Sequence, residues 1–305
     1  MKQLRNLMNG KKRKKMKIFN IIIESMIHKM YSHIIYHKAC PDGFGSAYIA
    51  WKVLGNSSAY IPLSYYDSVP EITESSILVC DFSFNYKTTI KLIKKNHKFF
   101  NIDHHQSAFD NLSELDDKYK LFDNNHSGAY LTWKYFFPDK EVPQFIKYIE
   151  DYDLWKFEYE ETKPFMLALN ELKFNFQLWS KLEDETFLNE MIQKGKILLE
   201  YQNTLINIVS KSVKIKIQNI GSSTYKVAYV NTNLFKNEIA NKLVSETDCD
   251  FSVVYNYDDA KNLTKFSLRS IDSKANVSEI AQSIGGGGHR NAAGYTKFGF
   301  HNSII

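Results

Sequence analysis

The segment NIDHH, residues 101–105, decides how the rest of this sequence is interpreted. An apolar run that begins at Phe99 leads directly into an aspartate and two histidines. These side chains are costly to bury unless something uses them, and carboxylate oxygen with neutral imidazole nitrogen suits hard or borderline divalent metal ions. Taken alone, such a segment is more often a surface pair of histidines behind a strand. Other segments must therefore support the metal interpretation.

Two earlier segments have the same form. The apolar run Ile34–Tyr36 leads into His37 and then Asp42, and the run Ile77–Cys80 leads into Asp81. Sites in an open parallel α/β sheet form just outside the carboxyl ends of the strands. Three buried-type strands that each end in a possible ligand therefore predict one shared site at that edge.

Helical patterns separate these strands. Helices are predicted at residues 47–54, 86–95, 130–137 and 144–150, and the glycine- and proline-containing stretch 37–45 is predicted to be a loop. Ser46 would start the first helix, whose N-terminus would face the site and favour an anion such as phosphate. The alternation predicts an α/β domain with a doubly wound, mainly parallel sheet.

The second half of the chain has a different pattern. Residues 165–211 are helical, strands follow at 213–217, 225–230, 251–257 and 264–268, and helices are predicted at 237–245 and 277–284. We therefore predict four parts: a basic N-terminal extension (1–30), a first α/β domain (31–165), a helical connector (166–212) and a smaller C-terminal α/β domain (213–305).

Charge and composition limit the classes of function. The net charge of +5 is concentrated at the N-terminus, since residues 1–17 contain eight basic residues and no acid, which leaves 31 basic against 34 acidic residues in the remainder. Long duplex DNA is not expected as a ligand, because tracking it needs many basic residues.

Three cysteines without a C-x-x-C pair fit a cytoplasmic or other reducing compartment. No apolar run reaches the length of a membrane span. The basic leader leaves nuclear or organelle targeting open, although a disordered tail is the interpretation we favour.

A two-metal hydrolase needs acids and imidazoles around a shared carboxylate. The candidates are the side chains at the predicted strand ends, together with an acid from the DYDLW segment: His37, Asp42, Asp81, His104 and Asp151. Carboxylates with imidazoles suit manganese or magnesium, and zinc, cobalt and iron stay open. Individually, Asp42 and Asp151 could equally be turn or cap residues.

A glycine run near the C-terminus, Gly285–Gly288, precedes His289 and Arg290. It is either a flexible loop or a phosphate-binding segment. We favour phosphate binding, because backbone without side chains beside basic groups lets donors approach a phosphate closely. Arg269, at the end of a predicted strand, is a second candidate for a phosphate contact, with an ordinary surface arginine as the alternative.

Together these motifs resemble the DHH phosphoesterases that carry the DHH-associated C-terminal domain, in particular their oligoribonuclease and cyclic-nucleotide phosphodiesterase branch. The resemblance covers about residues 31–297. It rests on HKACPDGFGSA (37–47), Asp81, DHH (103–105), DYDLW (151–155), SLRS (267–270) and GGGHRNAAG (286–294).

The resemblance implies two divalent ions, usually manganese, at the carboxyl edge of the first domain. His37 and Asp81 would hold one ion. The second ion would be held by Asp81, which bridges the two, together with Asp42, His104 and Asp151. Asp151 is preferred over Asp153 because Trp155 follows it at the spacing of the family's aromatic residue.

The resemblance also implies roles around the reaction. His105 would contact the scissile phosphate and Asp103 would orient the triplet from behind. The C-terminal domain would hold the substrate across the cleft through Arg269, Gly287, Gly288, His289 and Arg290.

One position departs from the family. Many members have Asp-x-Asp in the first motif, whereas this chain has Cys40 at the first of these positions. A thiol is a poor ligand for manganese. The cysteine therefore leaves one ion a carboxylate short, which affects how fully that site is occupied and by which metal. Because the branch that the chain resembles often has this shortened motif, we do not interpret it as inactivation.

These observations predict a metal-dependent phosphodiesterase, of the oligoribonuclease or exonuclease type, that acts on short oligonucleotides or small nucleotides through two-metal activation of water. Two alternatives stay open: a nucleotide 3′-phosphatase that acts on a monoester, and a catalytically silent nucleotide-binding sensor. The sequence is compatible with a homodimer without requiring one.

Overall fold

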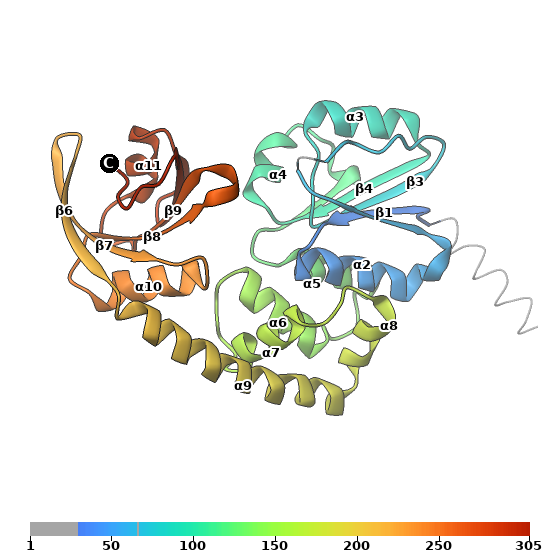
Figure 1. Cartoon of the computed structure of the whole chain (residues 1–305). Helices are drawn as coiled ribbons and strands as arrows, with labels where there is room; N and C mark the ends of the chain where they lie inside the picture. The colour runs from blue at the N-terminus through green and yellow to red at the C-terminus, as the bar shows by residue number, and fades with distance from the viewer. Residues whose placement is uncertain (1–29, 66) are drawn as a thin grey trace, which may run out of the picture. The chain divides into compact units, whose positions relative to one another are not determined.

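The computed structural model describes residues 30–65 and 67–305, which form two compact units that divide between Leu199 and Glu200 (Figure 1). The predicted basic extension lies outside the described residues except for Met30.

The first unit is built on a five-stranded, fully parallel sheet in the order β2-β1-β3-β4-β5. Its strands are β1 (His33–His37), β2 (Ala59–Leu63), β3 (Ser76–Cys80), β4 (Lys98–Asp103) and β5 (Lys120–Phe122). The predicted doubly wound parallel sheet is confirmed. The strands β2 and β5 were not predicted. They are short strands at the two edges, and β2 contains Pro62, which weakens a strand signal.

Helices cover both faces of this sheet. Figure 1 shows α3 (Tyr86–Lys95) on one face and α2 (Pro41–Leu54) with α5 (Gly128–Phe136) on the other. Neighbouring strand residues point to opposite faces: Ile35 packs in the cluster that contains Leu92 of α3, whereas Ile34 packs in the cluster that contains Leu131 of α5. Burial on both faces explains the continuous apolar runs of the sequence.

The remaining helices of this unit are α4 (Gln106–Asn111), α6 (Gln144–Asp153), α7 (Thr162–Asn170), α8 (Phe176–Trp179), the first part of α9 (Glu185–Ser210) and the 3-10 turns η1 (Gly55–Ser57), η2 (Asp117–Tyr119) and η3 (Ser180–Glu183). We expected residues 166–212 to form a separate connector, but several of them belong to the core of the first unit. Trp179, Leu188 and Met191 pack in the same buried cluster as Phe44 of α2. The helices up to the middle of α9 therefore complete the first unit.

Helix α2 begins at Pro41, within the stretch that was predicted to be a loop. Proline is well suited to the first helical position, and Gly43 serves close packing rather than turning. A Cβ atom at Gly43 would lie 2.3 Å from the carbonyl oxygen of His37. The first turn of α2 therefore presses against the end of β1 and brings Asp42 to the edge of the sheet.

The second unit has a six-stranded mixed sheet in the order β10-β11-β9-β8-β7-β6, in which only the β7–β8 pair is parallel. Its elements are β6 (Lys214–Ile220), β7 (Ser223–Asn231), α10 (Lys236–Glu246), β8 (Phe251–Asp258), η4 (Asp259–Lys261), β9 (Leu263–Arg269), α11 (Val277–Ser283), β10 (Gly287–His289) and β11 (Ala292–Phe298). Ile239 of α10 packs in a cluster with Val254, and Val277 of α11 packs in a cluster with Val253. The two helices therefore cover opposite faces of the sheet.

Among the helices of the described ranges, none combines the length and the apolar character that a membrane span requires.

Candidate metal centre

Four of the five side chains predicted to bind metal lie together at the carboxyl edge of the parallel sheet: His37, Asp42, Asp81 and His104. His37 ends β1, Asp81 directly follows β3, and His104 directly follows β4. The order β2-β1-β3 reverses the direction of winding between β1 and β3, and ligands of open α/β sheets bind outside such a switch point. The topology therefore places these side chains where a site is expected.

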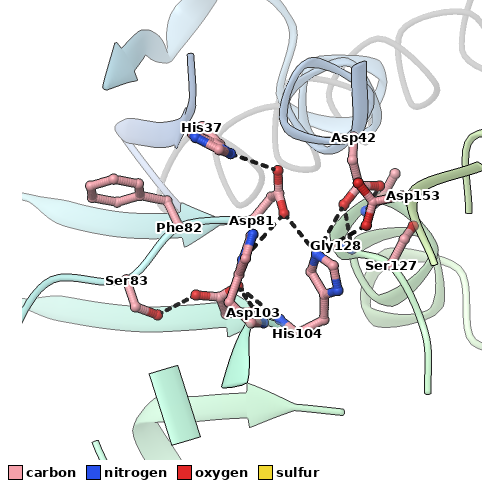
Figure 2. A network of polar contacts seen from close by, with 12 residues as sticks. His37, Asp42, Asp81, Phe82, Ser83, Asp103, His104, Ser127, Gly128 and Asp153 are labelled. Carbon is pink, nitrogen blue, oxygen red and sulfur yellow. Dashed lines mark hydrogen bonds and ion pairs between the residues drawn. The ribbon is translucent and has the colours of Figure 1, made fainter. Parts of the chain in front are cut away.

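Asp81 lies at the centre of this group (Figure 2). It is 1% exposed and has a left-handed backbone, with φ of 52°. One carboxylate oxygen lies 3.2 Å from Nε2 of His104 and the other lies 3.5 Å from Nδ1 of His37. Neither contact has the geometry of a hydrogen bond, and all four atoms are buried without a hydrogen-bond partner among the residues that the structure describes.

Buried polar atoms are normally hydrogen-bonded, so this exception needs a physical reason. A divalent cation provides one, since it would satisfy carboxylate oxygens and imidazole nitrogens that converge on one point. Within residues 30–65 and 67–305, two groups of ligand atoms have the necessary spacing, with all atoms of a group within 4.8 Å of one another. They are His37, Asp81 and His105, and Asp42, Asp81 and His104. Asp81 belongs to both groups, and the residues of each group fit the ligand chemistry of a divalent cation.

Asp42 is held in place by the start of α5. Its two oxygens accept hydrogen bonds from the backbone amides of Gly128 at 2.7 Å and Ala129 at 2.9 Å. Burial, followed by the charges of Asp81 and Asp153, raises the pKa of Asp42 well above its usual range. Each carboxylate oxygen still has a second lone pair, so these backbone bonds orient Asp42 without preventing it from binding a cation.

The structure corrects the prediction for Asp151. This carboxylate is buried and accepts hydrogen bonds from the amides of Glu158 and Tyr159 and from the hydroxyl of Thr162, so it organises the loop after α6. Asp153 faces the site instead, with one oxygen 3.4 Å from Nε2 of His104 (Figure 2). Both residues are on α6, and positions two apart on a helix point in nearly opposite directions.

Asp103 and His105 form a second pair behind Asp81. One oxygen of Asp103 accepts from the amides of His104 and His105 and lies 2.8 Å from Nδ1 of His105, and the other accepts from the hydroxyl of Ser83 at 2.5 Å. Asp103 is therefore fully engaged and orients the His105 ring. If Nδ1 carries the proton of this bond, Nε2 is the nitrogen left for another partner.

The charge balance of the site depends on His104. Burial opposes its protonation, but Asp81 and the charges of Asp42 and Asp153 outweigh burial and raise the pKa of His104 to about 9. For Asp81, burial favours the neutral acid, but His104 and His37 outweigh it and lower its pKa. Without a metal ion, a proton on His104 therefore offsets part of the negative charge, and a cation would compete with that proton.

Two residues of the site were not recognised in the sequence. Asp153 was considered and rejected, and Gly128 was interpreted only as part of a helix cap. A Cβ atom at Gly128 would lie 2.6 Å from Cβ of Asp81 and 2.9 Å from an oxygen of Asp42. Only glycine lets α5 approach both carboxylates this closely, and its place beside the cap residue Ser127 was the available signal.

Cys40 precedes the first turn of α2. Burial, followed by the charges of Asp81 and Asp42, raises the pKa of the thiol. Neither converging group of ligand atoms in the described chain includes Cys40. Because Cys40 is not among the converging ligand atoms, we do not assign it to the candidate metal centre.

The predicted substrate-binding residues of the second unit lie in one part of its sheet. Ala292 of β11 pairs with Arg269 on one side and with His289 on the other, so these three residues form a row across neighbouring strands. The Arg269 side chain donates to Asn237 and to a backbone carbonyl, and Arg290 donates to the carbonyl of Asp272.

The glycine run forms a hairpin rather than the flexible loop that was one of its interpretations. Gly288 has φ of 146°, and a Cβ atom there would lie 2.5 Å from the carbonyl oxygen of Ala292. Gly287 is exposed, and a Cβ atom there would have no heavy atom within 4 Å. Hairpin packing therefore accounts for Gly288 but does not account for Gly287.

Comparison with known proteins identifies the second unit most directly. Residues 223–297 match the model of the DHHA1 domain. The chain is 34% identical over 278 residues to the uncharacterized protein R106 of Acanthamoeba polyphaga mimivirus, covering 86% of this chain and 66% of that protein. It is 22% identical over 214 residues to the oligoribonuclease NrnB of Bacillus subtilis, covering 67% of this chain and 52% of that protein. The chain thus spans between about half and two thirds of these relatives.

A solved structure supports the fold of both units. The pGpG-specific phosphodiesterase PggH of Vibrio cholerae matches with a TM-score of 0.56 and 15% sequence identity, over 87% of this chain and 93% of that one. At this level of identity the match bears on the fold, which agrees with the architecture described above.

Proposed function

The chain belongs to the DHH superfamily of phosphoesterases, and from this premise we propose that it is a metal-dependent phosphodiesterase that hydrolyses short oligonucleotides or small nucleotides. The names of two relatives support the substrate class, since one is an oligoribonuclease and the other a phosphodiesterase of a dinucleotide. The single observation that carries the proposal is the buried Asp81 carboxylate, which faces two imidazoles without a hydrogen bond.

In this proposal the metal ions are held by the five side chains that converge at the edge of the sheet: His37, Asp42, Asp81, His104 and Asp153. The mixture of carboxylate and imidazole suits Mn²⁺, with Mg²⁺ or Co²⁺ as alternatives. When bound, such ions lower the pKa of water and stabilise negative charge on phosphoryl oxygens.

His105 is the residue that we propose to touch the substrate. Its Nδ1 is bound to Asp103, which leaves Nε2 to contact a phosphoryl oxygen. Burial opposes protonation of His105, but the bond and charge of Asp103 outweigh it and raise its pKa. A protonated ring donates a hydrogen bond to charge that develops in the transition state. Asp103 then acts as a positioning residue.

We also propose that the second unit binds a part of the substrate away from the reacting bond. The row of Arg269 and His289, with Arg290 and the exposed backbone of Gly287 close by in the sequence, offers basic groups and open backbone. Planar guanidinium groups and bare amides are the donors that phosphate recognition uses.

The test is hydrolysis by the full chain with Mn²⁺ on three substrates: the dinucleotide pApA, bis(p-nitrophenyl) phosphate, and AMP that carries a 3′-phosphate. We expect cleavage of both diesters that EDTA abolishes. Asp81→Asn should abolish it as well, whereas the matched control Asp139→Asn, an exposed acid, should not. Turnover of the monoester alone would favour the 3′-phosphatase. Nucleotide binding without turnover of any substrate would favour the sensor.

A further inference from the structure

A pocket of about 290 Å³ lies beside the metal centre within the first unit. Phe82 and Ser83, which line it, directly follow Asp81, and the Ser83 hydroxyl also donates to Asp103 (Figure 2). Tyr65 lines it as well, and the centroid of its ring lies 5.6 Å from that of His37 and 6.4 Å from that of His105. The pocket and the proposed reaction site therefore share a wall.

The lining of the pocket combines aromatic surface with uncharged polar groups. Tyr65, which is 48% exposed, supplies an accessible ring, and the buried rings of Phe82 and Phe84 lie behind it, with the Tyr65 and Phe82 centroids 4.9 Å apart. Thr88 and Asn111 add a hydroxyl and an amide, and neither side chain makes a hydrogen bond to another of the described residues. Rings with a few polar groups that remain available are typical of sites for small organic molecules.

The charge of the lining excludes a phosphate as the preferred occupant. None of the described residues that line the pocket is a lysine or an arginine, and Asp67 adds a carboxylate. Lys38 is not part of the lining, but its Nζ lies 3.6 Å from the Asp67 carboxylate and offsets part of that charge. A phosphate would therefore meet no cation in the described lining itself, whereas a flat, uncharged ring with hydrogen-bonding edges would find stacking surface and polar partners. The volume is at the lower end of ligand pockets, which suits one such group.

We propose that this pocket binds one base of the substrate and thereby positions the adjacent phosphodiester at the metal centre. The inference deepens the proposed function and rests on it. It assigns the recognition of a base to the first unit, next to the reaction site, and the recognition of phosphate to the second.

The experiment compares pApA with its two abasic versions, each lacking one base, using the full chain and Mn²⁺. We expect that removing the base that occupies the pocket lowers kcat/KM about tenfold to a hundredfold, since stacking of a base on aromatic side chains contributes this much. Ser107→Phe should fill the pocket from its exposed rim. It should lower the cleavage of intact pApA by a similar factor and abolish the further effect of removing that base.

The matched control is Ser113→Phe, which makes the same substitution at an exposed position that does not line the pocket. It should retain the full effect of removing the base. A second variant, Asn111→Leu, removes the amide and should give a smaller loss in the same direction. If Ser107→Phe retains the full effect of base removal, or if neither base matters to the natural chain, the pocket does not bind a base.

A binding measurement separates this inference from the proposed function. Calorimetry with AMP and Mn²⁺ needs no turnover. Weaker binding in Ser107→Phe than in Ser113→Phe supports the pocket even if no diester is cleaved, in which case only the proposed function fails. Equal AMP binding in both variants, or no AMP binding to the natural chain, overturns the pocket proposal.

Discussion

The two units present their polar groups in opposite ways. At the edge of the parallel sheet, the oxygens of Asp81 are buried and have no hydrogen-bond partner within the described part of the chain. On the hairpin of the second unit, His289 and Arg290 are exposed and Arg290 donates to a backbone carbonyl. The first arrangement is costly without a ligand, whereas the second costs little because water solvates exposed groups.

This difference shows which polar groups indicate a bound ligand from the structure alone. Three aspartates at the same sheet edge illustrate the difference. Asp42 accepts hydrogen bonds from two backbone amides, and Asp103 accepts from amides and from a hydroxyl. Among the described residues, Asp81 has no such donor. A buried carboxylate without hydrogen-bond partners needs a cation to offset the cost of its burial. The exposed side chains of His289 and Arg290 are solvated by water and need no ligand for stability, so their role depends on the substrate.

The largest effect is expected for Asp81→Asn. Loss of residues that only orient metal ligands typically costs about tenfold to a hundredfold, so loss of a carboxylate shared by two ions should reduce diester hydrolysis about a thousandfold or more. Manganese binding, measured by calorimetry, should fall with it while circular dichroism stays unchanged. More than a tenth of the natural rate, together with normal metal content, would contradict the two-metal assignment.

A second pair of variants tests which acid of α6 belongs to the site. Asp153→Asn removes a proposed ligand and should lower manganese affinity and activity by about a hundredfold or more, since losing a residue that only orients a ligand already costs about tenfold to a hundredfold. Thermal stability should change little. Asp151→Asn should lower the free energy of unfolding by about 2–4 kcal/mol, because it weakens bonds to two amides and a hydroxyl. The opposite pattern in activity and melting experiments would restore Asp151 as the ligand.

The pH dependence of metal binding tests the competition at His104. The pKa of His104 is raised to about 9 in the protein without metal, so below that pH a cation must displace a proton. Apparent manganese affinity should therefore rise with pH, by about tenfold per unit while one proton is released, and level off above about 9. Calorimetry in buffers of different ionisation enthalpy counts the protons. Affinity that does not change between pH 6 and 8 would exclude this competition.

Variants of the second unit should affect substrates unequally. Arg290→Ala and His289→Ala should lower kcat/KM for pApA by about tenfold to a hundredfold, since charge-assisted hydrogen bonds contribute about 1.5–3 kcal/mol each. They should affect bis(p-nitrophenyl) phosphate far less, because that ester is small enough to bind at the metal centre alone. Lys261→Ala, an exposed change in the same unit, is the control. Equal losses on both substrates would show that the hairpin serves the chemistry or the fold.

The smallest effect is expected at Cys40. The neutral thiol is not among the converging ligand atoms, so Cys40→Ser should retain activity within about twofold under reducing conditions. Cys40→Asp should tighten one ion if a carboxylate there can reach it. A large loss in Cys40→Ser, accompanied by loss of bound zinc or iron, would identify the thiolate as a ligand.

Some features follow from local sequence alone. Apolar runs buried on both faces identify β1, β3 and β4 as parallel strands, and strands of one parallel sheet end at the same edge. His37, Asp81 and His104 therefore had to come near each other once the sheet formed. The DHH, HKACPDG and GGGHR segments likewise carried the family resemblance without any knowledge of packing.

Other features were decided only by the tertiary structure. Asp151 and Asp153 are chemically identical in the sequence, and the rotation of α6 determines which one faces the site. In the sequence, Gly43 and Gly128 are typical of turn or cap residues. In the structure each is required because another residue lies too close for a Cβ atom: His37 beside Gly43, and Asp81 beside Gly128. The pocket beside Asp81 combines residues from a loop, α3 and α4 that no spacing rule connects. Local sequence sets the direction and chemistry of each element, but the contacts between elements determine which side chains meet.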